Sequence, residues 1–268
     1  HRYSRIGAGD LTNTSTQFIG DISTPSRNPY FGVNYYSNLS GKEKLMISNH
    51  IHQQGTGAGI VPNRQENVGK YANTSNPLET INIYTGGANT WNTGSEVVVL
   101  GWDPADTHTS NFWEELASVD LSGGANANLS TGTFTAKKYL WVQVFTEASS
   151  AVLHNITFNN DTGSNYSRRN SQNGGAEQTD SSASQIQMWV ANTGTWFWNM
   201  FIVNNASNEK LAVIHNSELS AAGAGTAPNR IDGVAKWANT SAQITEIDFT
   251  TTTNTFGTNS IIKVFGSD

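Results

Sequence analysis

The sequence repeats itself at long range, and this repeat limits the folds that the chain can adopt. The stretch that begins at Glu43 aligns without a gap with the stretch that begins at Glu209. Solenoid and propeller units repeat at about 20–50 residues, so the much longer period seen here predicts two tandem domains. The matching motifs are Pro-Asn-Arg at 62–64 and 228–230, and Lys-aromatic-Ala-Asn-Thr-Ser at 70–75 and 236–241.

Apolar and polar residues alternate with period two in both copies, which is typical of half-buried β-strands. The alternation predicts strands around 45–47, 81–83 and 97–99 in the first copy and at the matching positions of the second. Val97 and Val99 are expected to face inward and Val98 outward. In the second copy, Leu140, Val142 and Val144 are expected to share one strand face. Further strands are predicted near 186–190 and 196–200, and turns at Gly86-Gly87, 159–163 and 173–175.

These patterns predict an all-β chain of two tandem antiparallel, jelly-roll-like β-sandwich domains that arose by internal duplication. The first domain is expected at 1–104 and the second at 105–268, with a linker over 104–109. The only helix-like segment, 112–117, could equally open a strand.

The first copy is expected to lack its opening strands. Residues 111–165 carry strand-like patterns, but nothing corresponding to them precedes Tyr3-Ser4-Arg5, which matches Tyr166-Ser167-Arg168. A sandwich without those strands would expose sheet edges and an apolar face. Two explanations are open: upstream sequence, which is favoured, or strands that a neighbouring chain donates.

Composition excludes several classes of function. Charged residues are 13% of the chain and the net charge is −6, which disfavours a nucleic-acid binder that neutralises phosphates. The absence of cysteine excludes disulfides, thiol nucleophiles and iron–sulfur clusters. No apolar run reaches the roughly 18 residues of a membrane-spanning helix.

No catalytic motif is present, so we expect no enzyme activity, no catalytic residues and no cofactor. The Gly-rich loop 55–59 lies between strands and is interpreted as a flexible loop. Glu114 and Glu115 would point to opposite faces of a strand, which disfavours a glycosidase pair. Glu43 and Glu209 begin equivalent strands in different domains, so they do not form such a pair either.

No metal site is expected. His50 and His52 could form a metal pair, but their counterparts are Asn216 and Glu218, so surface histidines are the favoured interpretation. Two oxygen-rich stretches, Asp103 with Asp106 and Asn159-Asn160-Asp161, could bind calcium or form local Asx turns, and the turns are favoured.

The duplicated charges are the strongest candidates for a defined role in a chain so poor in charge. The favoured interpretation is that the cations bind a carboxylate or loop carbonyls while the asparagines hold a turn. The alternative is a subunit or glycan contact. These residues are Arg64, Lys70, Asn73, Arg230, Lys236 and Asn239.

The order of motifs in the second copy resembles β-sandwich modules in structural proteins of tailed viruses of bacteria and archaea, of the head-decoration and fibre types. The motifs are Phe112–Leu116, Tyr139–Phe145, Phe158–Gly163, Lys236–Ser241 and Lys263–Gly266. The resemblance implies a multimeric surface component without enzyme activity, and it carries no catalytic residues.

We therefore expect a structural or assembly protein of a virion or another extracellular surface. Its partners would be copies of itself and other structural subunits, and neither nucleic acid nor a membrane. The alternative is a carbohydrate-binding adhesion or receptor-binding module, in which exposed aromatic residues such as Trp91 and Trp102 stack on sugars.

Overall fold

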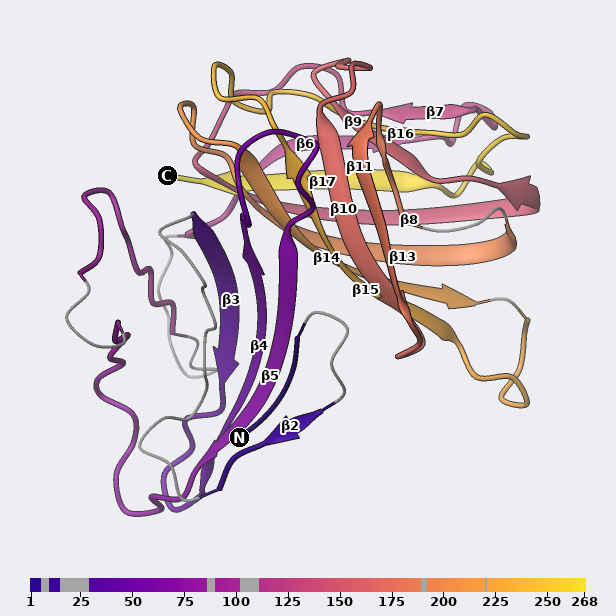
Figure 1. Ribbon diagram of the computed structural model, residues 1–268. Helices are drawn as coiled ribbons and strands as arrows, with labels where there is room; N and C mark the ends of the chain where they lie inside the picture. The colour runs from indigo at the N-terminus through magenta and orange to yellow at the C-terminus, as the bar shows by residue number, and fades with distance from the viewer. Residues whose placement is uncertain (6–9, 15–28, 86–89, 102–110, 189–191, 220) are drawn as a thin grey trace.

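The chain is all-β, as the alternation predicts. The computed structural model describes residues 1–5, 10–14, 29–85, 90–101, 111–188, 192–219 and 221–268, and these contain strands and no helix (Figure 1). The described residues therefore include no helix that could cross a membrane. The helix-like segment near 112–117 leads into a strand, β6 (Glu114–Asp120).

The second copy is a sandwich of an eight-stranded and a four-stranded antiparallel sheet. The eight-stranded sheet has the order β11 (Glu177–Ala183), β10 (Tyr166–Gln172), β15 (Asn229–Trp237), β14 (Lys210–Leu219), β13 (Asn192–Val203), β8 (Tyr139–Val152), β17 (Ile261–Ser267) and β6. The four-stranded sheet has the order β12 (Ile186–Gln187), β9 (Asn155–Phe158), β16 (Ile247–Thr250) and β7 (Asn128–Ser130).

The main hydrophobic core lies between these two sheets, and strand alternation decides which residues enter it. Leu140, Val142 and Val144 of β8 are fully buried, as predicted, and the intervening residues are partly exposed on the outer face. Trp198 and Met200 of β13 are buried on the same inner face. Full burial of one such aliphatic side chain contributes about 1.5–3 kcal/mol, so this face anchors the second copy.

The first copy forms a single five-stranded sheet. Its order is β2 (Leu11–Thr12), β1 (Arg2–Arg5), β5 (Asn63–Tyr71), β4 (Lys44–His52) and β3 (Tyr30–Tyr36). The order matches β11-β10-β15-β14-β13 of the second copy strand for strand. The register also matches, because Tyr30 pairs with His52, and Trp196, which lies at the same offset of the repeat, pairs with Glu218, the equivalent of His52. Two copies of one module would produce this agreement.

The two sheets differ beyond β3. In the second copy the sheet continues from β13 to β8, β17 and β6, whereas in the described part of the first copy the sheet ends at β3. The strands predicted at 81–83 and 97–99 are not formed, and Val97 and Val99 are exposed instead of facing inward. Their counterparts, β16 and β17, are strands because they pair with β7, β9, β6 and β8. The described residues of the first copy contain no strand in the place of any of these four partners.

The two copies meet through the outer faces of their sheets, as the steep crossing in Figure 1 shows. Ile51 of β4 is fully buried against Leu211, Val213 and Val234 of the eight-stranded sheet. The predicted linker, the domain boundary at 104/105 and the Gly86-Gly87 turn lie outside the described residues. The predicted turn at 173–175 is present, with positive φ at Asn173 and Gly174, and it joins β10 to β11.

Candidate functional site

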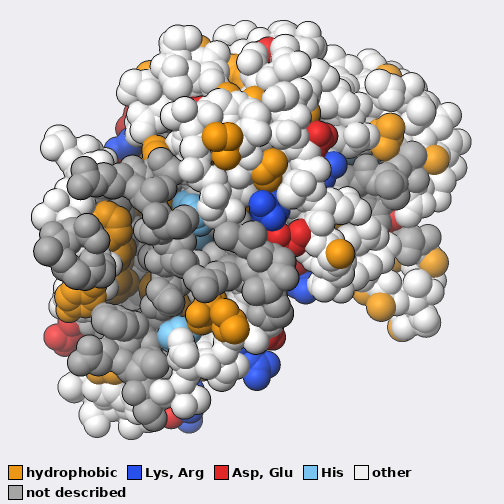
Figure 2. All heavy atoms as spheres, viewed as in Figure 1, with side chains coloured by type: hydrophobic (Ala, Val, Ile, Leu, Met, Phe, Trp, Pro, Cys, Tyr) orange, Lys and Arg blue, Asp and Glu red, His pale blue; other side chains and the backbone are white. Residues whose placement is uncertain are grey.

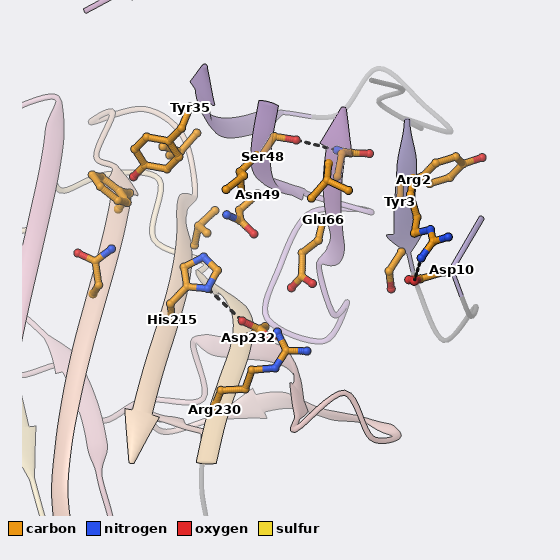
Figure 3. A pocket seen from close by; sticks show the side chains of 18 residues that line it. Arg2, Tyr3, Asp10, Tyr35, Ser48, Asn49, Glu66, His215, Arg230 and Asp232 are labelled. Carbon is orange, nitrogen blue, oxygen red and sulfur yellow. Dashed lines mark hydrogen bonds and ion pairs between the residues drawn. The ribbon is translucent and has the colours of Figure 1, made fainter. Parts of the chain in front are cut away.

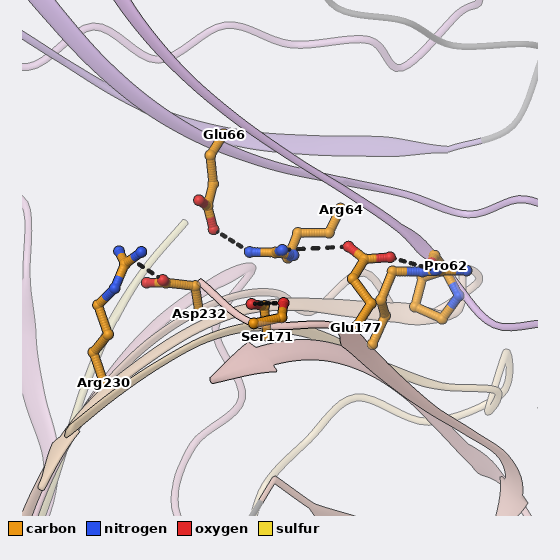
Figure 4. A network of polar contacts seen from close by, with 9 residues as sticks. Pro62, Arg64, Glu66, Ser171, Glu177, Arg230 and Asp232 are labelled. Carbon is orange, nitrogen blue, oxygen red and sulfur yellow. Dashed lines mark hydrogen bonds and ion pairs between the residues drawn. The ribbon is translucent and has the colours of Figure 1, made fainter. Parts of the chain in front are cut away.

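A carboxylate from the second copy bridges the two copies (Figure 4). Glu177 of β11 binds Arg64 of β5 at 3.3 Å and Arg169 of β10 at 2.7 Å. Arg169 also donates a hydrogen bond to the carbonyl of Pro62 at 2.9 Å. The Pro-Asn-Arg motif of the first copy therefore contacts the second copy through both its carbonyl and its guanidinium. Arg64 pairs within its own strand as well, with Glu66.

The equivalent Pro-Asn-Arg motif of the second copy, at 228–230, has a different role. Arg230 pairs with Asp232 at 2.9 Å, which repeats the Arg64–Glu66 spacing, but the Arg230 side chain is 59% exposed. Asp232 also accepts a hydrogen bond from His215 at 3.2 Å. The arginine–carboxylate pair is therefore present in both copies. Of the two arginines, Arg64 but not Arg230 forms an ion pair with the opposite copy.

Between the outer faces of the two sheets lies an open cleft of about 470 Å³ (Figure 3). Equivalent positions of the repeat line its two walls. Tyr35, Asn49 and Glu66 lie on the first wall, and their equivalents in the alignment, Phe201, His215 and Asp232, lie on the second. The cleft therefore combines aromatic rings, amides and carboxylates.

The two carboxylates of the cleft have opposite pKa shifts. Burial raises the pKa of Glu66, although Arg64 opposes the rise. Burial would also raise the pKa of Asp232, but the hydrogen bond from His215 and the charge of Arg230 outweigh it and lower the pKa. Asp232 is therefore the more firmly ionised of the two, and neither of them lacks a cationic neighbour.

Lys236 fixes a loop of the opposite copy. Its ammonium is completely buried, pairs with Glu209 at 3.1 Å and donates to the carbonyls of Gly55 and Gly57 at 2.8 Å each. Glu209 in turn accepts hydrogen bonds from the Gln53 side chain and from the Gly57 amide. The Gly-rich loop 55–59 is therefore held to the second copy rather than free.

The same lysine–glutamate pair occurs in the first copy without this role. Lys70 and Glu43 lie 2.9 Å apart, but their side chains are 56% and 41% exposed. The two asparagines of the motif do hold turns. Asn73 accepts hydrogen bonds from the amides of Ser75 and Asn76, and Asn239 does the same for the amides of Ser241 and Ala242.

Two buried lysines escaped the sequence interpretation. Lys44 donates to the carbonyl of Asn73 at 3.1 Å, and Lys210 donates to the carbonyl of Asn239 at 2.8 Å. Burial lowers the pKa of Lys210 to about 8. Glu-Lys-Leu begins both copies of the repeat, and this repeated lysine is the sequence signal that points to the pair.

The favoured interpretation of His50 and His52 as surface residues is wrong, because both are buried on β4. His50 hydrogen-bonds to the side chains of Asn34 and Asn67, which satisfies both ring nitrogens without a metal. The residues that the structure describes include no group of three His, Cys, Asp or Glu side chains suited to a metal ion.

The remaining candidate site residues either have hydrogen-bond or ion-pair partners, are partly exposed, or lie outside the described residues. Glu114 and Glu115 pair with different lysines, Lys137 and Lys263. Asp161 accepts a hydrogen bond from the amide of Gly163, as in an Asx turn, and Asn159 accepts one from the amide of Thr245 in a distant segment. Trp91 is half exposed. Asp103, Asp106 and Trp102 are not among the described residues.

Exposed apolar side chains are concentrated in the first copy. Of the large apolar side chains that are exposed among the described residues, all but Phe197 and Leu219 lie within 1–101. Orange groups over the five-stranded sheet mark some of them at the lower left of Figure 2. Six lie on its strands and four lie in or directly beside the predicted closing strand: Leu11, Tyr35, Leu45, Ile47, Val68 and Tyr71, and Val97, Val98, Val99 and Leu100.

The counterparts of these side chains in the second copy are mostly buried. Leu211, Val213 and Val234, which match Leu45, Ile47 and Val68, have exposed fractions of 1–2%. Ile262 and Val264, which match Val97 and Val99, are fully buried. In the second copy, β4 of the first copy covers the first group and the sandwich core covers the second, whereas in the first copy both groups are exposed.

Comparison with known proteins identifies no relative: no family model, no curated protein and no solved structure matches this chain.

Proposed function

We propose that this protein is a structural component of a multimeric assembly and acts through subunit contacts made by its first copy. The exposed apolar surface of residues 1–101 carries the proposal. Many exposed large apolar side chains in one part of a folded protein mark an interaction site. The virion or extracellular surface suggested by the resemblance to tailed-virus modules is the setting we propose for it.

The contrast between the copies supports this function. An exposed valine or isoleucine on its own needs no explanation. Here, however, the matching positions of the second copy are buried, some of them against the first copy and the others in the sandwich core. The bridge through Glu177 and the pair Lys236–Glu209 hold the first copy in place and leave its exposed surface available to other chains.

Native mass spectrometry and size-exclusion chromatography test the proposal. We expect the wild-type protein to form multimers, and the double substitution Val97→Asp with Val99→Asp to shift it toward monomers. Phe197→Asp is the matched control, because Phe197 is exposed in the second copy and its substitution should leave assembly unchanged. A wild-type protein that stays monomeric at every concentration tested would refute the proposed function.

The cleft supports a second candidate, carbohydrate binding. Sugars are bound by aromatic faces combined with carboxylates and amides that accept and donate hydrogen bonds. Tyr35 and Phe201 supply the rings, and Asp232, Glu66 and Asn49 supply polar groups in the same cleft. No hydrogen bond to the Asn49 side chain is found within the described part of the chain.

A glycan array decides whether this candidate holds. If the cleft binds sugars, Tyr35→Ala should weaken the array signal by about tenfold, which corresponds to a lost stacking contact of about 1.4 kcal/mol. Tyr71→Ala is the control, since Tyr71 is 44% exposed and does not line the cleft. An array without signal, or equal loss in both variants, removes the cleft from consideration.

A further inference from the structure

The open edge of β3 has a definite hydrogen-bonding pattern. The amide of Ser37 donates to the carbonyl of Leu45, and the amide of Gln53 donates to the carbonyl of Pro29, so positions 29 and 37 bond toward β4. Bonding direction alternates along an antiparallel strand. The amides and carbonyls of Gly32, Asn34 and Tyr36 therefore point away from β4, and β4 is the only strand paired with β3 among the described residues.

The second copy shows which strand belongs at this edge. There β8 lies between β13 and β17 and pairs with both in antiparallel orientation. Val144 of β8 stands opposite Trp198 and Ile262, and Val142 stands opposite Met200 and Val264. Unpaired edge strands accept such additions readily, because every outward amide and carbonyl gains a partner.

The β8 strand of this chain cannot supply the missing strand. It is hydrogen-bonded along both edges within the eight-stranded sheet, and Leu140, Val142 and Val144 are fully buried in the core. The β6 strand is paired with β17. Among the described residues, neither β8 nor β6 is therefore available to fill the position next to β3.

We propose that the first copy takes up one extended strand from another polypeptide chain, placed between β3 and residues 96–101 in the position that β8 occupies in the second copy. This inference rests on the proposed assembly function and names the partner. The strand runs antiparallel to β3. The inward-facing residues of the added strand are apolar and branched. One of them lies between Gly32 and Val97, as Val144 lies between Trp198 and Ile262. The next inward-facing residue lies between Asn34 and Val99.

The register follows from the repeat. Gly32 and Asn34 correspond to Trp198 and Met200 because they stand opposite equivalent residues of β4 and β14. Val97 and Val99 match Ile262 and Val264 after a slip of one position. Once a strand is added to β3, residues 96–101 gain the pairing partner that they lack. Their exposed valines then lie on the inner face, as Ile262 and Val264 do.

Hydrogen exchange with a synthetic strand tests this inference on the intact protein. The probe is a peptide with the sequence of β8, residues 139–152. We expect it to slow exchange of the Gly32, Asn34 and Tyr36 amides by at least about tenfold. The amides of Val33 and Tyr35 point toward β4 and should be slow with or without the peptide, so they serve as the internal control.

The control peptide carries Val142→Asp and Val144→Asp, and it should give no protection. The same three amides should also be protected in the multimer that the wild-type protein forms. Multimers without protection of these amides, together with no effect of the β8 peptide, would overturn the strand uptake and leave the assembly function standing. Equal protection by both peptides would overturn the proposed register.

Discussion

Replacing Lys236 by methionine is expected to lower the free energy of unfolding by about 3–5 kcal/mol. The ammonium of Lys236 is completely buried, and its removal leaves the Glu209 carboxylate, whose side chain is 4% exposed, without its cation. The carbonyls of Gly55 and Gly57 lose their donor at the same time. Urea unfolding followed by tryptophan fluorescence measures the loss.

Lys70→Met is the matched control, because Lys70 occupies the equivalent position of the repeat. Its pair with Glu43 is exposed, and exposed pairs contribute about 0–1 kcal/mol. We expect a loss in that range. Similar losses for the two variants would show that burial of Lys236 against the opposite copy does not matter, and would contradict the role assigned to it.

Acidification from pH 6.5 to pH 4 is expected to reduce the free energy of unfolding by about 3 kcal/mol for each of two buried histidines. Burial lowers the pKa of His50 to about 4 and that of His154 to about 3. The unfolded chain, with a histidine pKa near 6.5, binds protons over this range that the folded chain does not. Stability is therefore complete above pH 6.5 and declines as the pH falls.

His154 is the better residue with which to test this loss. The centroid of its ring lies 4.6 Å from the ring centroid of Trp196 and 5.3 Å from that of Phe256. Among the described residues, Nε2 has a hydrogen-bond partner, the Thr146 hydroxyl, and Nδ1 has none. In His154→Phe the difference in stability between pH 8 and pH 4 should shrink by about 3 kcal/mol. At pH 8 the histidine is neutral in both the folded and the unfolded chain, so the free energy of unfolding measured there reports only the change in packing. An unchanged pH dependence would contradict the assignment.

Much of the fold was predictable from the sequence because it depends on local chemistry. Alternation placed Leu140, Val142 and Val144 on one buried face, and the strands around Leu45 and Leu211 formed as expected. The turn of Asn73 was also predictable, since an Asx turn needs only the residues that directly follow. Burial of His50 was not, because it depends on contacts with Asn34 and Asn67 of neighbouring strands.

The amino-acid order alone identified the repeat, the all-β class and the inward positions of the second copy, because these follow from periodicity and residue type. The tertiary structure decided which copy of a repeated motif forms a strand or becomes buried. Val97 and Ile262 have similar sequence surroundings, yet of the two only Ile262 lies in a strand, because β-strands need partners and Ile262 has them in β6 and β8. Lys70 and Lys236 share a motif, yet only Lys236 is buried, because only it meets a loop of the other copy.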